Sequence, residues 1–377
     1  FDLSVTESFN EALYATPTVS SSTTPAGVFE ANDGIALPGN GWIGTESVSS
    51  GSAWIRLTFD STKTIYRVVL NDIIGPAARL EAGSIELSDG SSVVIGAPLP
   101  DDGTAQEFVF TPVQTDWVQI NLTQATGSYG LAEIAAYSAL DPNQTKLKED
   151  LFNDVNANGW APRADGSGCE RGAFNWGVDI DAAVLPQGYQ QTGDCRSFTP
   201  EGVETGTHSL LEDFTIPGAG MDLRLRLLAG DTGAGWTNGA IGVLFGYQGV
   251  DDNNYYRLDI SGLEGHRKLL KKQGGAFTEL DTSPQSYTLG TWFNLRIVHQ
   301  NDVILVYQDG EKVLAVEDST FSGGRIALFC ARNESCNFDN VIILSEPSDP
   351  IFGMNIADED LLNIPGSVGH KSGEYFV

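Results

Sequence analysis

The strongest constraint on the fold is a repeated alternation of apolar and polar residues in short runs. Between Ser52 and Tyr137 these runs include 54–59 (WIRLTF), 66–70 (YRVVL) and 117–122 (WVQINL). Gly, Asp, Asn and Pro separate the runs, which is typical of short antiparallel strands joined by turns. Alternation gives each strand one face for a core and one for solvent. We therefore predict an all-β sandwich for the first part of the chain.

The same alternation resumes after residue 150 and continues to Leu344. The Asp309-Gly310 pair predicts a tight hairpin, because these residues readily adopt the positive φ that such a turn requires. The second part of the chain is therefore also predicted to be all-β. Its clearest strands are predicted at residues 221–227, 241–245, 255–260, 292–297, 303–307 and 325–329.

A chain of 377 residues has room for more than one domain with its own core. We predict a first sandwich over residues 1–140, a linker over 141–149 and a second sandwich over 150–346. Residues 347–377 are predicted to be a tail or the start of a further module. The chain begins on Phe1 rather than Met, and we expect both of its ends to be processed or trimmed.

The composition is strongly acidic, with 50 Asp and Glu residues against 21 Lys and Arg and a formal net charge of −29. A field of this sign repels nucleic-acid phosphates and anionic membranes and attracts divalent cations. No apolar run approaches the roughly 20 residues needed to cross a bilayer. We therefore expect neither a nucleic-acid partner nor insertion into a membrane.

The four cysteines are Cys169, Cys195, Cys330 and Cys336, and none belongs to a C-x-x-C pair. An even number at these spacings favours two disulfides, for which three pairings are possible. We predict the local pairing, Cys169 with Cys195 and Cys330 with Cys336. Disulfides form in oxidising compartments, so we expect a secreted or extracellular protein.

The first part of the chain carries an ordered set of segments, among them Ala31-Asn-Asp-Gly34, Trp42 and Gly130-Leu-Ala-Glu-Ile134. With these, residues 25–138 resemble the discoidin-like modules of the galactose-binding fold, which include the coagulation factor C domains. The resemblance implies a jelly-roll sandwich in which Asp33 and Glu133 ligate a structural calcium. Calcium prefers several hard oxygen ligands, which carboxylates supply. The alternative is that Asp33 makes an Asx turn and Glu133 is solvated.

Residues 150–345 resemble the concanavalin-like and laminin-G-like sandwiches of lectins and of sugar-binding modules attached to glycoside hydrolases. The segments that carry this resemblance are 151–160, 242–247, 253–259, 290–296, 324–329 and 337–341. The resemblance implies a concanavalin-like sandwich that binds sugar on its concave face or rim. The predicted fold class is therefore all-β, a jelly-roll β-sandwich followed by a concanavalin-like β-sandwich.

The segment Asp154-Val-Asn-Ala-Asn-Gly159 fits a second calcium site of the EF-hand type. Its candidate ligands are Asp154, Asn156, Asn158 and Asp165, whose side-chain oxygens would wrap the ion while Gly159 allows the sharp turn. The alternative is that this segment forms only the opening strand and turn of the second sandwich, because no convincing helix follows it.

We predict a glycan site on the second sandwich, with calcium as a structural cofactor. Trp176 could stack on a sugar ring, and its neighbours Arg171, Asn175 and Asp179 supply hydrogen-bond donors and acceptors. The alternative for each Trp is burial in the core. The predicted ligand-binding residues are Arg171, Asn175, Trp176, Asp179, Trp236, Tyr247, Tyr256 and Arg257.

These features favour a secreted, non-catalytic, lectin-like carbohydrate-binding or adhesion protein, or the targeting modules of a larger polysaccharide-degrading enzyme. No catalytic residue is assigned, because the chain carries none of the common hydrolase motifs and no His lies in a triad context. The alternative is a glycoside hydrolase or polysaccharide lyase that acts on the concave face of the second sandwich. A protein partner is a third possibility, while the glycan and the oligomeric state stay open.

Overall fold

The computed structural model describes most of the two predicted sandwiches. The described residues are 8–23, 25–34, 36, 41–45, 53–74, 78–127, 129–139, 144–152, 157–164, 176–179, 188–192, 197–199, 203–218, 220–230, 239–249, 251–300, 302–333 and 335–345. The fold is all-β, a jelly-roll sandwich followed by a concanavalin-like sandwich, which confirms the predicted fold class. The chain divides into two compact units, one built mainly from residues up to Pro142 and one mainly from residues after Asn143.

The first unit is organised by a sheet with the strand order β1-β9-β4-β7-β5-β6, in which β2 also pairs with β4. Two short helical segments, η1 (Glu11–Tyr14) and α1 (Pro25–Glu30), and the pair β3 (Trp42–Ile43) with β8 (Gly130–Leu131) accompany it. The strands of the sheet are β1 (Ser8–Asn10), β2 (Thr16–Val19), β4 (Ala53–Asn71), β5 (Ala78–Leu87), β6 (Ser92–Ile95), β7 (Gln106–Gly127) and β9 (Glu133–Ala139).

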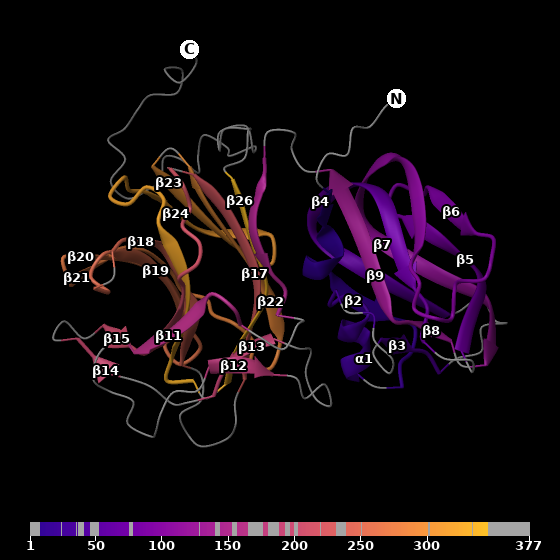
Figure 1. The fold of residues 1–377 in the computed structure, drawn as a ribbon, viewed down its shortest axis with the longest axis horizontal. Helices are drawn as coiled ribbons and strands as arrows, with labels where there is room; N and C mark the ends of the chain where they lie inside the picture. Colours follow the sequence, from indigo (N-terminus) through magenta and orange to yellow (C-terminus); the bar gives the residue numbers. More distant parts are fainter. Residues whose placement is uncertain are drawn as a thin grey trace, which may run out of the picture. The chain divides into compact units, whose positions relative to one another are not determined.

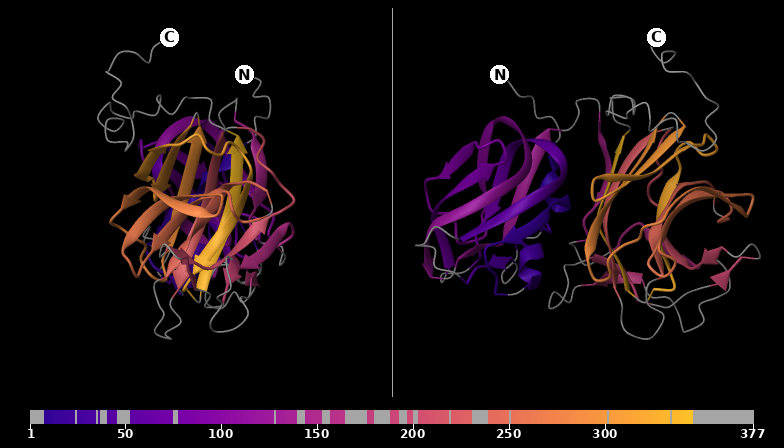
Figure 2. Two further views of the ribbon diagram at one scale, coloured as in Figure 1. Left: turned by 90° about the vertical axis from the view of Figure 1, so that its left-hand side faces the viewer. Right: turned by 180° about the vertical axis from the view of Figure 1, so that it is seen from behind.

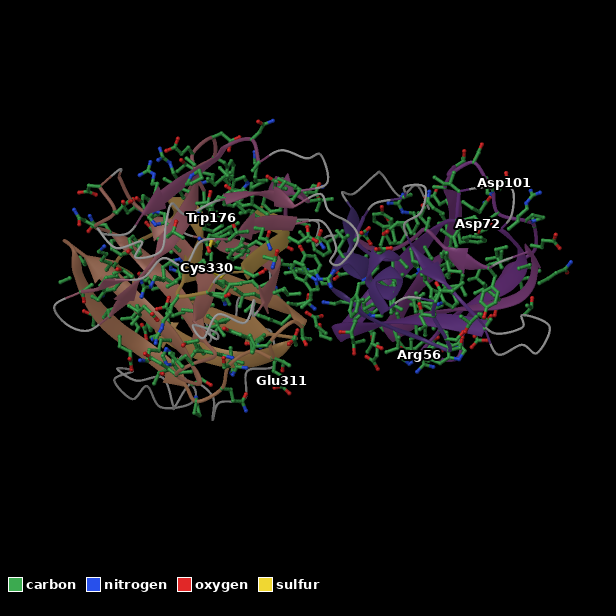
Figure 3. All side chains as sticks on the ribbon, turned by 90° about the horizontal axis from the view of Figure 1, so that it is seen from below. Arg56, Asp72, Asp101, Trp176, Glu311 and Cys330 are labelled. Atoms are coloured by element: carbon green, nitrogen blue, oxygen red, sulfur yellow. A yellow bond between two sulfur atoms is a disulfide. The ribbon has the colours of Figure 1, made fainter. Side chains whose placement is uncertain are left out.

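Alternate residues of this sheet fill the core of the first unit. Ile55 and Leu57 of β4 pack with Ile120 of β7 and with Trp42, and all four are at most 1% exposed. Arg56, which lies between Ile55 and Leu57 and is labelled in Figure 3, points to the other face, where its guanidinium lies 4.2 Å from the centroid of the Trp117 ring. The period of two read from the sequence therefore sets the inner and outer faces.

The second unit is a sandwich of two sheets, which we call sheet II and sheet III (Figures 1 and 2). Sheet II has the order β12-β13-β26-β17-β22-β23-β24, with β10 paired to β26. Its strands are β10 (Lys146–Asp150), β12 (Trp176–Asp179), β13 (Gly188–Gln191), β17 (Met221–Gly230), β22 (Trp292–Gln300), β23 (Val303–Gln308), β24 (Glu311–Glu317) and β26 (Ser335–Ser345).

Sheet III has the order β11-β16-β25-β18-β19-β20-β21. A short pair, β14 (Ser197–Phe198) with β15 (Glu204–Thr205), precedes β16 in the chain. The strands of sheet III are β11 (Trp160–Ala164), β16 (Thr207–Leu211), β18 (Ala240–Tyr247), β19 (Tyr255–Ser261), β20 (His266–Gln273), β21 (Ala276–Ser283) and β25 (Arg325–Ala331).

The core of the second unit lies between sheets II and III. Leu223 and Leu225 of β17 pack there with Val243 and Phe245 of β18 and with Leu258 of β19. Each is at most 1% exposed, so each apolar side chain contributes close to its full burial energy, about 1.5–3 kcal/mol. We call the opposite side of sheet III, which faces away from this core, its outer face.

A disulfide joins Cys330 at the end of β25 to Cys336 at the start of β26 (Figure 3), as predicted. Cys169 and Cys195, the other predicted pair, lie outside the described residues. Within the described ranges, no helix combines the length and the apolar character that a membrane span requires.

Candidate functional site

Strand β19 shows how polar side chains reach the outer face of sheet III. Tyr256, Leu258 and Ile260 pack in the core between the sheets. The alternate residues Tyr255, Arg257 and Asp259 must therefore point the other way, onto the outer face. Charged residues at alternate positions of a completely buried strand are unusual, since burying a charge is costly unless it is paired.

Arg257 is the centre of the first polar cluster on this face. It is 0% exposed, and its Nη2 lies 2.6 Å from Oδ2 of Asp259 and donates to the carbonyl oxygen of Glu204 at 2.7 Å. Its guanidinium also lies over the rings of Phe329, at 4.5 Å, and Phe277, at 4.9 Å. We call Glu204, Arg257 and Asp259 the Arg257 cluster.

Burial governs the protonation of this cluster. It raises the pKa of Asp259 against the attraction of Arg257. It also raises the pKa of Glu204 to about 7, although the nearby Arg332 pulls that pKa down. Oε1 of Glu204 lies 3.8 Å from Nη1 of Arg332, a loose ion pair. The cluster therefore contains an acid whose charge changes near neutral pH.

A second polar cluster centres on His208 of β16. Register places His208 between Arg163 of β11 and Phe329 of β25. Its Nε2 lies 3.6 Å from Oδ1 of Asp252, which lies 3.6 Å from Nη1 of Arg163 and accepts a hydrogen bond from the Tyr247 hydroxyl. We call Arg163, His208, Tyr247 and Asp252 the His208 cluster.

Backbone geometry brings two of these side chains to the outer face. Gly246 has a φ of 59°, and at this bulge the pairing of β18 with β25 shifts, so that Tyr247 joins Leu244 on the outer face. Asp252 lies in the turn between β18 and β19 with a φ of 54°. Asp adopts this left-handed conformation more readily than most residues, so the turn can hold the carboxylate here.

His208 is 0% exposed, yet neither of its ring nitrogens has a hydrogen-bond partner among the residues that the structure describes. A buried polar group without a partner costs roughly 1–3 kcal/mol, and such groups are rare in native proteins. Burial opposes ionisation of the neighbouring Asp252, but His208, Arg163 and Lys272 outweigh it and lower the pKa of that carboxyl. An imidazole therefore stands beside a carboxylate that stays ionised.

Aromatic rings form an apolar wall next to these clusters. The rings of Tyr247 and Tyr255 stack with centroids 5.6 Å apart and an interplanar angle of 3°. Phe277 meets Tyr255 edge-on at 6.2 Å, and Nζ of Lys272 lies over both rings, at 5.3 and 5.0 Å. The outer face thus combines charged groups, an imidazole without a hydrogen-bond partner among the described residues, and aromatic rings, of which Tyr247 and Tyr255 are at most 2% exposed. Side chains of these kinds are those that small-molecule sites use for recognition.

The predicted ligand-binding residues fall in different places. Tyr247 and Arg257 lie on the outer face of sheet III. Tyr256 lies in the core between the sheets, where it contacts Phe245 and Phe321, and its hydroxyl donates to Asp318 at 2.6 Å. Alternation explains the difference, because Tyr256 and Arg257 are adjacent on one strand.

Trp176, labelled in Figure 3, is partly buried and packs against the core rather than forming an open platform. It contacts the rings of Tyr189 at 5.2 Å and Phe338 at 5.8 Å, and its Nε1 donates to Thr207 Oγ1 at 2.9 Å. Asp179 ends β12, but its side chain is outside the described part. Arg171, Asn175 and Trp236 also lie outside the described residues.

The predicted calcium ligands of the first unit are both buried, Asp33 at 3% and Glu133 at 6% exposure. Their segments run side by side, because the Ile134 N–H donates to the Ala31 carbonyl oxygen at 2.7 Å. Two carboxylates are fewer than the six to eight oxygens that calcium takes, so carbonyl oxygens would have to complete the site. Across the described ranges, no group of three or more His, Cys, Asp or Glu side chains is placed to hold a metal. Calcium here stays a prediction.

Most of the predicted ligands of the EF-hand-type calcium site lie outside the described residues. These are Asp154, Asn156 and Asp165. Asn158 lies in an exposed turn before β11. The next residue, Gly159, has a φ of 88°, and a Cβ there would come within 2.6 Å of the Asp213 carboxylate. This glycine therefore serves the turn.

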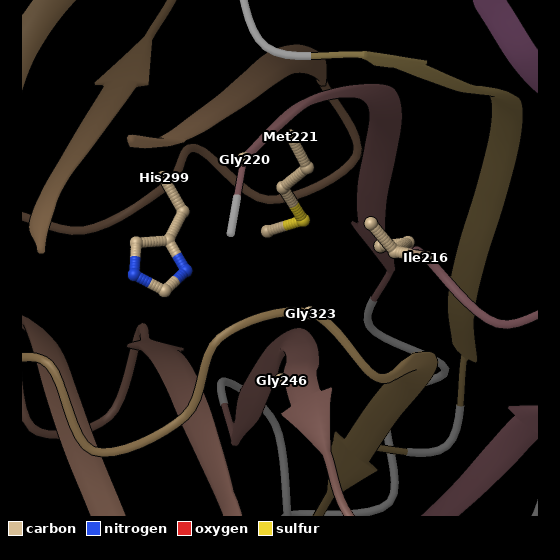
Figure 4. A pocket seen from close by; sticks show the side chains of 6 residues that line it. All are labelled: Ile216, Gly220, Met221, Gly246, His299 and Gly323. Carbon is tan, nitrogen blue, oxygen red and sulfur yellow. The ribbon is translucent and has the colours of Figure 1, made fainter. Parts of the chain in front are cut away.

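A small cavity lies at one end of the second core (Figure 4). His299 and Met221 line it, together with Ile216 and the backbone of three glycines. Its volume is about 10 Å³. This is room for about one water molecule, so the cavity is no candidate for a sugar.

Sequence reasoning missed most of the His208 and Arg257 clusters. His208, Arg163, Glu204 and Asp259 come from separate strands, so only the strand register brings them together. One signal was present in the sequence. Arg257 and Asp259 alternate with apolar residues in a run that is otherwise typical of a buried strand.

Two family models match the chain. The model described as the 3-keto-alpha-glucoside-1,2-lyase-like domain matches residues 148–344, more than half of the 377 residues. A model described as a domain of unknown function matches residues 10–137. No curated protein sequence matches the chain.

Several solved structures match the chain in a structural comparison. The carbohydrate-binding module CBM66 from Bacillus subtilis is 18% identical with a TM-score of 0.37, covering 50% of this chain and 95% of that one. Truncated AlyQ, with CBM32 and alginate lyase domains, is 13% identical with a TM-score of 0.30, covering 90% and 99%. The family 32 module of C. perfringens NanJ, in complex with galactose, is 12% identical with a TM-score of 0.30, covering 35% and 99%.

Proposed function

Because the chain belongs, through residues 148–344, to the family of 3-keto-alpha-glucoside-1,2-lyase-like domains, we propose that the outer face of sheet III binds a carbohydrate. The ligand class is a glycoside, in keeping with the family description. The observation that carries the proposal is His208, a completely buried imidazole without a hydrogen-bond partner in the described part of the chain.

A sugar suits the groups that meet there. Each sugar hydroxyl both donates and accepts hydrogen bonds, so it can satisfy an imidazole nitrogen and a carboxylate oxygen together. The apolar faces of a pyranose pack well on aromatic rings, and the partly exposed Phe277 provides one beside the clusters. The buried pair of Arg257 and Asp259 supplies fixed charge next to that wall.

The proposal also includes secretion and a structural calcium ion. The Cys330–Cys336 disulfide favours an oxidising compartment, and hence secretion. The buried carboxylates Asp33 and Glu133 make the first unit a candidate for a structural calcium.

A second candidate function is cleavage of the bound glycoside on the same face. Fold alone does not choose between binding and catalysis. The observation in favour of catalysis is the imidazole of His208 beside the carboxylate of Asp252, an arrangement that suits proton transfer. The non-catalytic, lectin-like function is retained if binding occurs without turnover.

The test is a glycan array probed with the intact chain, first in calcium and then in EDTA, followed by calorimetry on each hit. We expect binding that weakens about tenfold in His208→Ala, the effect of losing one to two hydrogen bonds. The matched control is His266→Ala, since His266 lies on β20, contacts Glu264 at 3.2 Å and belongs to neither cluster. Equal affinities for the two variants would reject this site, and a protein partner would be favoured if no glycan bound.

A further inference from the structure

The sheet of the first unit carries two tryptophans and an arginine on the face that points away from its core. Trp54 and Arg56 alternate on β4 with side chains that fill the core. Trp117 of β7 is paired with Thr58, the next residue of β4 on this face. The Arg56 guanidinium lies 5.8 Å from the centroid of the Trp54 ring and 4.2 Å from that of Trp117. Aromatic surface and a positive charge therefore meet at one place.

A row of hydrogen-bonded side chains continues from Arg56 across the same face. Nε of Arg56 donates to Oε1 of Gln119 at 2.8 Å, and Nε2 of Gln119 donates to Oδ1 of Asn121 at 2.6 Å. The bond from Nε fixes the orientation of the guanidinium and leaves its two Nη groups as further donors. The group that we call the Arg56 platform consists of Trp54, Arg56, Trp117, Gln119 and Asn121.

Arg56 differs from other cations of the first unit in its lack of an acidic partner. Lys63 and Arg67 pair with carboxylates at 2.7 and 3.0 Å. Among the described residues, Arg56 makes one hydrogen bond to an amide oxygen and two ring contacts, but no ion pair. The acid on the same face, Glu86, lies beyond Gln119 on β5, about 10 Å away at the usual strand spacing. A cation in this setting is complementary to an anionic group of a ligand.

The face around the platform is open in the part of the chain that the structure describes. Arg56 and both tryptophans are partly exposed. Thr18 of β2, which is paired with Arg56, is exposed, and so is Thr58. At the other edge, Val94 of β6 is 73% exposed. A ligand can therefore reach the guanidinium and the rings without displacing these side chains.

We propose that the Arg56 platform binds a uronic-acid unit of an acidic polysaccharide. The paired N–H groups of a guanidinium match the two oxygens of a carboxylate. The apolar face of a pyranose packs on a Trp ring, and the amides of Gln119 and Asn121 can exchange hydrogen bonds with sugar hydroxyls. A carboxylate attached to a sugar ring uses all these groups, whereas an acidic peptide uses mainly the charge. This site lies on the first unit and does not depend on a ligand at the outer face of sheet III.

The acidity of the whole chain opposes such a ligand only at long range. A net charge of −29 repels a polyanion before contact. At physiological ionic strength this repulsion is screened beyond about 8 Å, whereas a guanidinium and a carboxylate in contact are screened much less. Contact with Arg56 therefore decides whether an acidic sugar is held.

The experiment is calorimetry of the intact chain at physiological ionic strength with two acidic hexasaccharides, oligogalacturonate and oligomannuronate. Each is compared with its methyl ester, which keeps the sugar chain but removes the negative charge. The variants are Arg56→Gln and Arg56→Lys. The matched control is Arg67→Gln, because it removes the same charge from the same strand at a residue that pairs with Glu107.

We expect at least one acidic hexasaccharide to bind, and Arg56→Gln to weaken that binding by about 10- to 100-fold, the effect of losing a charge-assisted pair. Arg56→Lys should restore only part of the affinity, because an ammonium keeps the charge but not the planar fork. Arg67→Gln should bind as the wild-type protein does. The methyl ester should bind wild type and Arg56→Gln equally, the sign that Arg56 acts on the carboxylate.

Several outcomes would overturn the proposal. These are no binding of either acidic hexasaccharide to the wild-type protein, equal binding of acid and ester, or unchanged affinity in Arg56→Gln. A glutamate hexapeptide that bound the platform as tightly as the sugars would identify an acidic peptide as the partner instead. Loss of binding in His208→Ala but not in Arg56→Gln would place the acidic chain on sheet III, so failure of this site is distinguishable from failure of the proposed function.

Discussion

Gly242 allows the backbones of β18 and β19 to approach closely in sheet III. It lies on β18 between Phe329 and Asp259, and a Cβ there would come within 1.8 Å of the Leu258 carbonyl oxygen. We predict that Gly242→Ala lowers the free energy of unfolding by more than about 2 kcal/mol, because backbone must move to relieve the clash.

Urea unfolding measures this effect, and Gly177→Ala on β12 is the control, since nothing lies within 4 Å of its Cβ position. Equal stability of the two variants would contradict the close approach of the β18 and β19 backbones at Gly242.

Glu204 gives the second prediction at the residue scale. Burial raises its pKa from 4.5 to about 7 in the folded protein. Between those two pH values the unfolded chain has lost a proton that the folded protein keeps, so the free energy of unfolding falls as pH rises through this window. The loss should be larger in the wild-type protein than in Glu204→Gln by on the order of 1–3 kcal/mol.

The measurement is urea unfolding of both proteins at about pH 5 and about pH 8, compared as differences. Parallel changes in the two proteins would mean that Glu204 ionises normally in the folded state.

Single residues were predictable where local rules decide them. Tyr247 and Arg257 were expected at the ligand face because they lie on central strands. Tyr256 was expected there too, but its position next to Arg257 sends it to the core. His208 gave no signal, because its lack of a hydrogen-bond partner in the described ranges arises only once β16 is paired.

The connection between β25 and β26 carries a prediction at the scale of elements. The Cys330–Cys336 disulfide closes a loop with a sequence separation of 6 and joins two strands that belong to different sheets. We predict that the double substitution of Cys330→Ala and Cys336→Ala lowers the free energy of unfolding by about 2 kcal/mol, mainly by freeing the unfolded chain. Urea unfolding tests this, and an unchanged or raised stability would contradict it.

Strand positions were predicted well in the second unit. The run 221–227 lies within β17, 255–260 within β19 and 325–329 within β25. In the first unit, the runs 54–59 and 66–70 were read as separate strands, yet both belong to β4. Register shifts between Thr58 and Lys63 and between Ile65 and Arg67 interrupt the alternation, so one long bent strand looked like two.

The first unit carries a prediction at the scale of the molecule. If Asp33 and Glu133 bind calcium, the ion should raise the melting temperature of the intact chain, because it binds only the folded protein. We predict that this rise disappears in EDTA and in Glu133→Gln. The control is Glu107→Gln on β7, whose carboxylate is half exposed and pairs with Arg67. Identical melting temperatures in calcium and in EDTA would contradict calcium binding at Asp33 and Glu133.

The molecule as a whole shows why the fold could be predicted further than the site. Alternation along single strands is local and sufficed for two sandwiches. The His208 and Arg257 clusters combine β11, β15, β16, β18, β19 and the turn after β18, and their meeting depends on strand order and on the bulge at Gly246. Neither can be read from spacing along the chain.

The most direct test of the account is amide hydrogen exchange of the intact chain, with and without a saturating glycoside identified on the array. The account predicts that the ligand slows exchange in β16 (Thr207–Leu211), β19 (Tyr255–Ser261) and the turn that holds Asp252. Protection confined to residues of the first unit, with none in these segments, would contradict it.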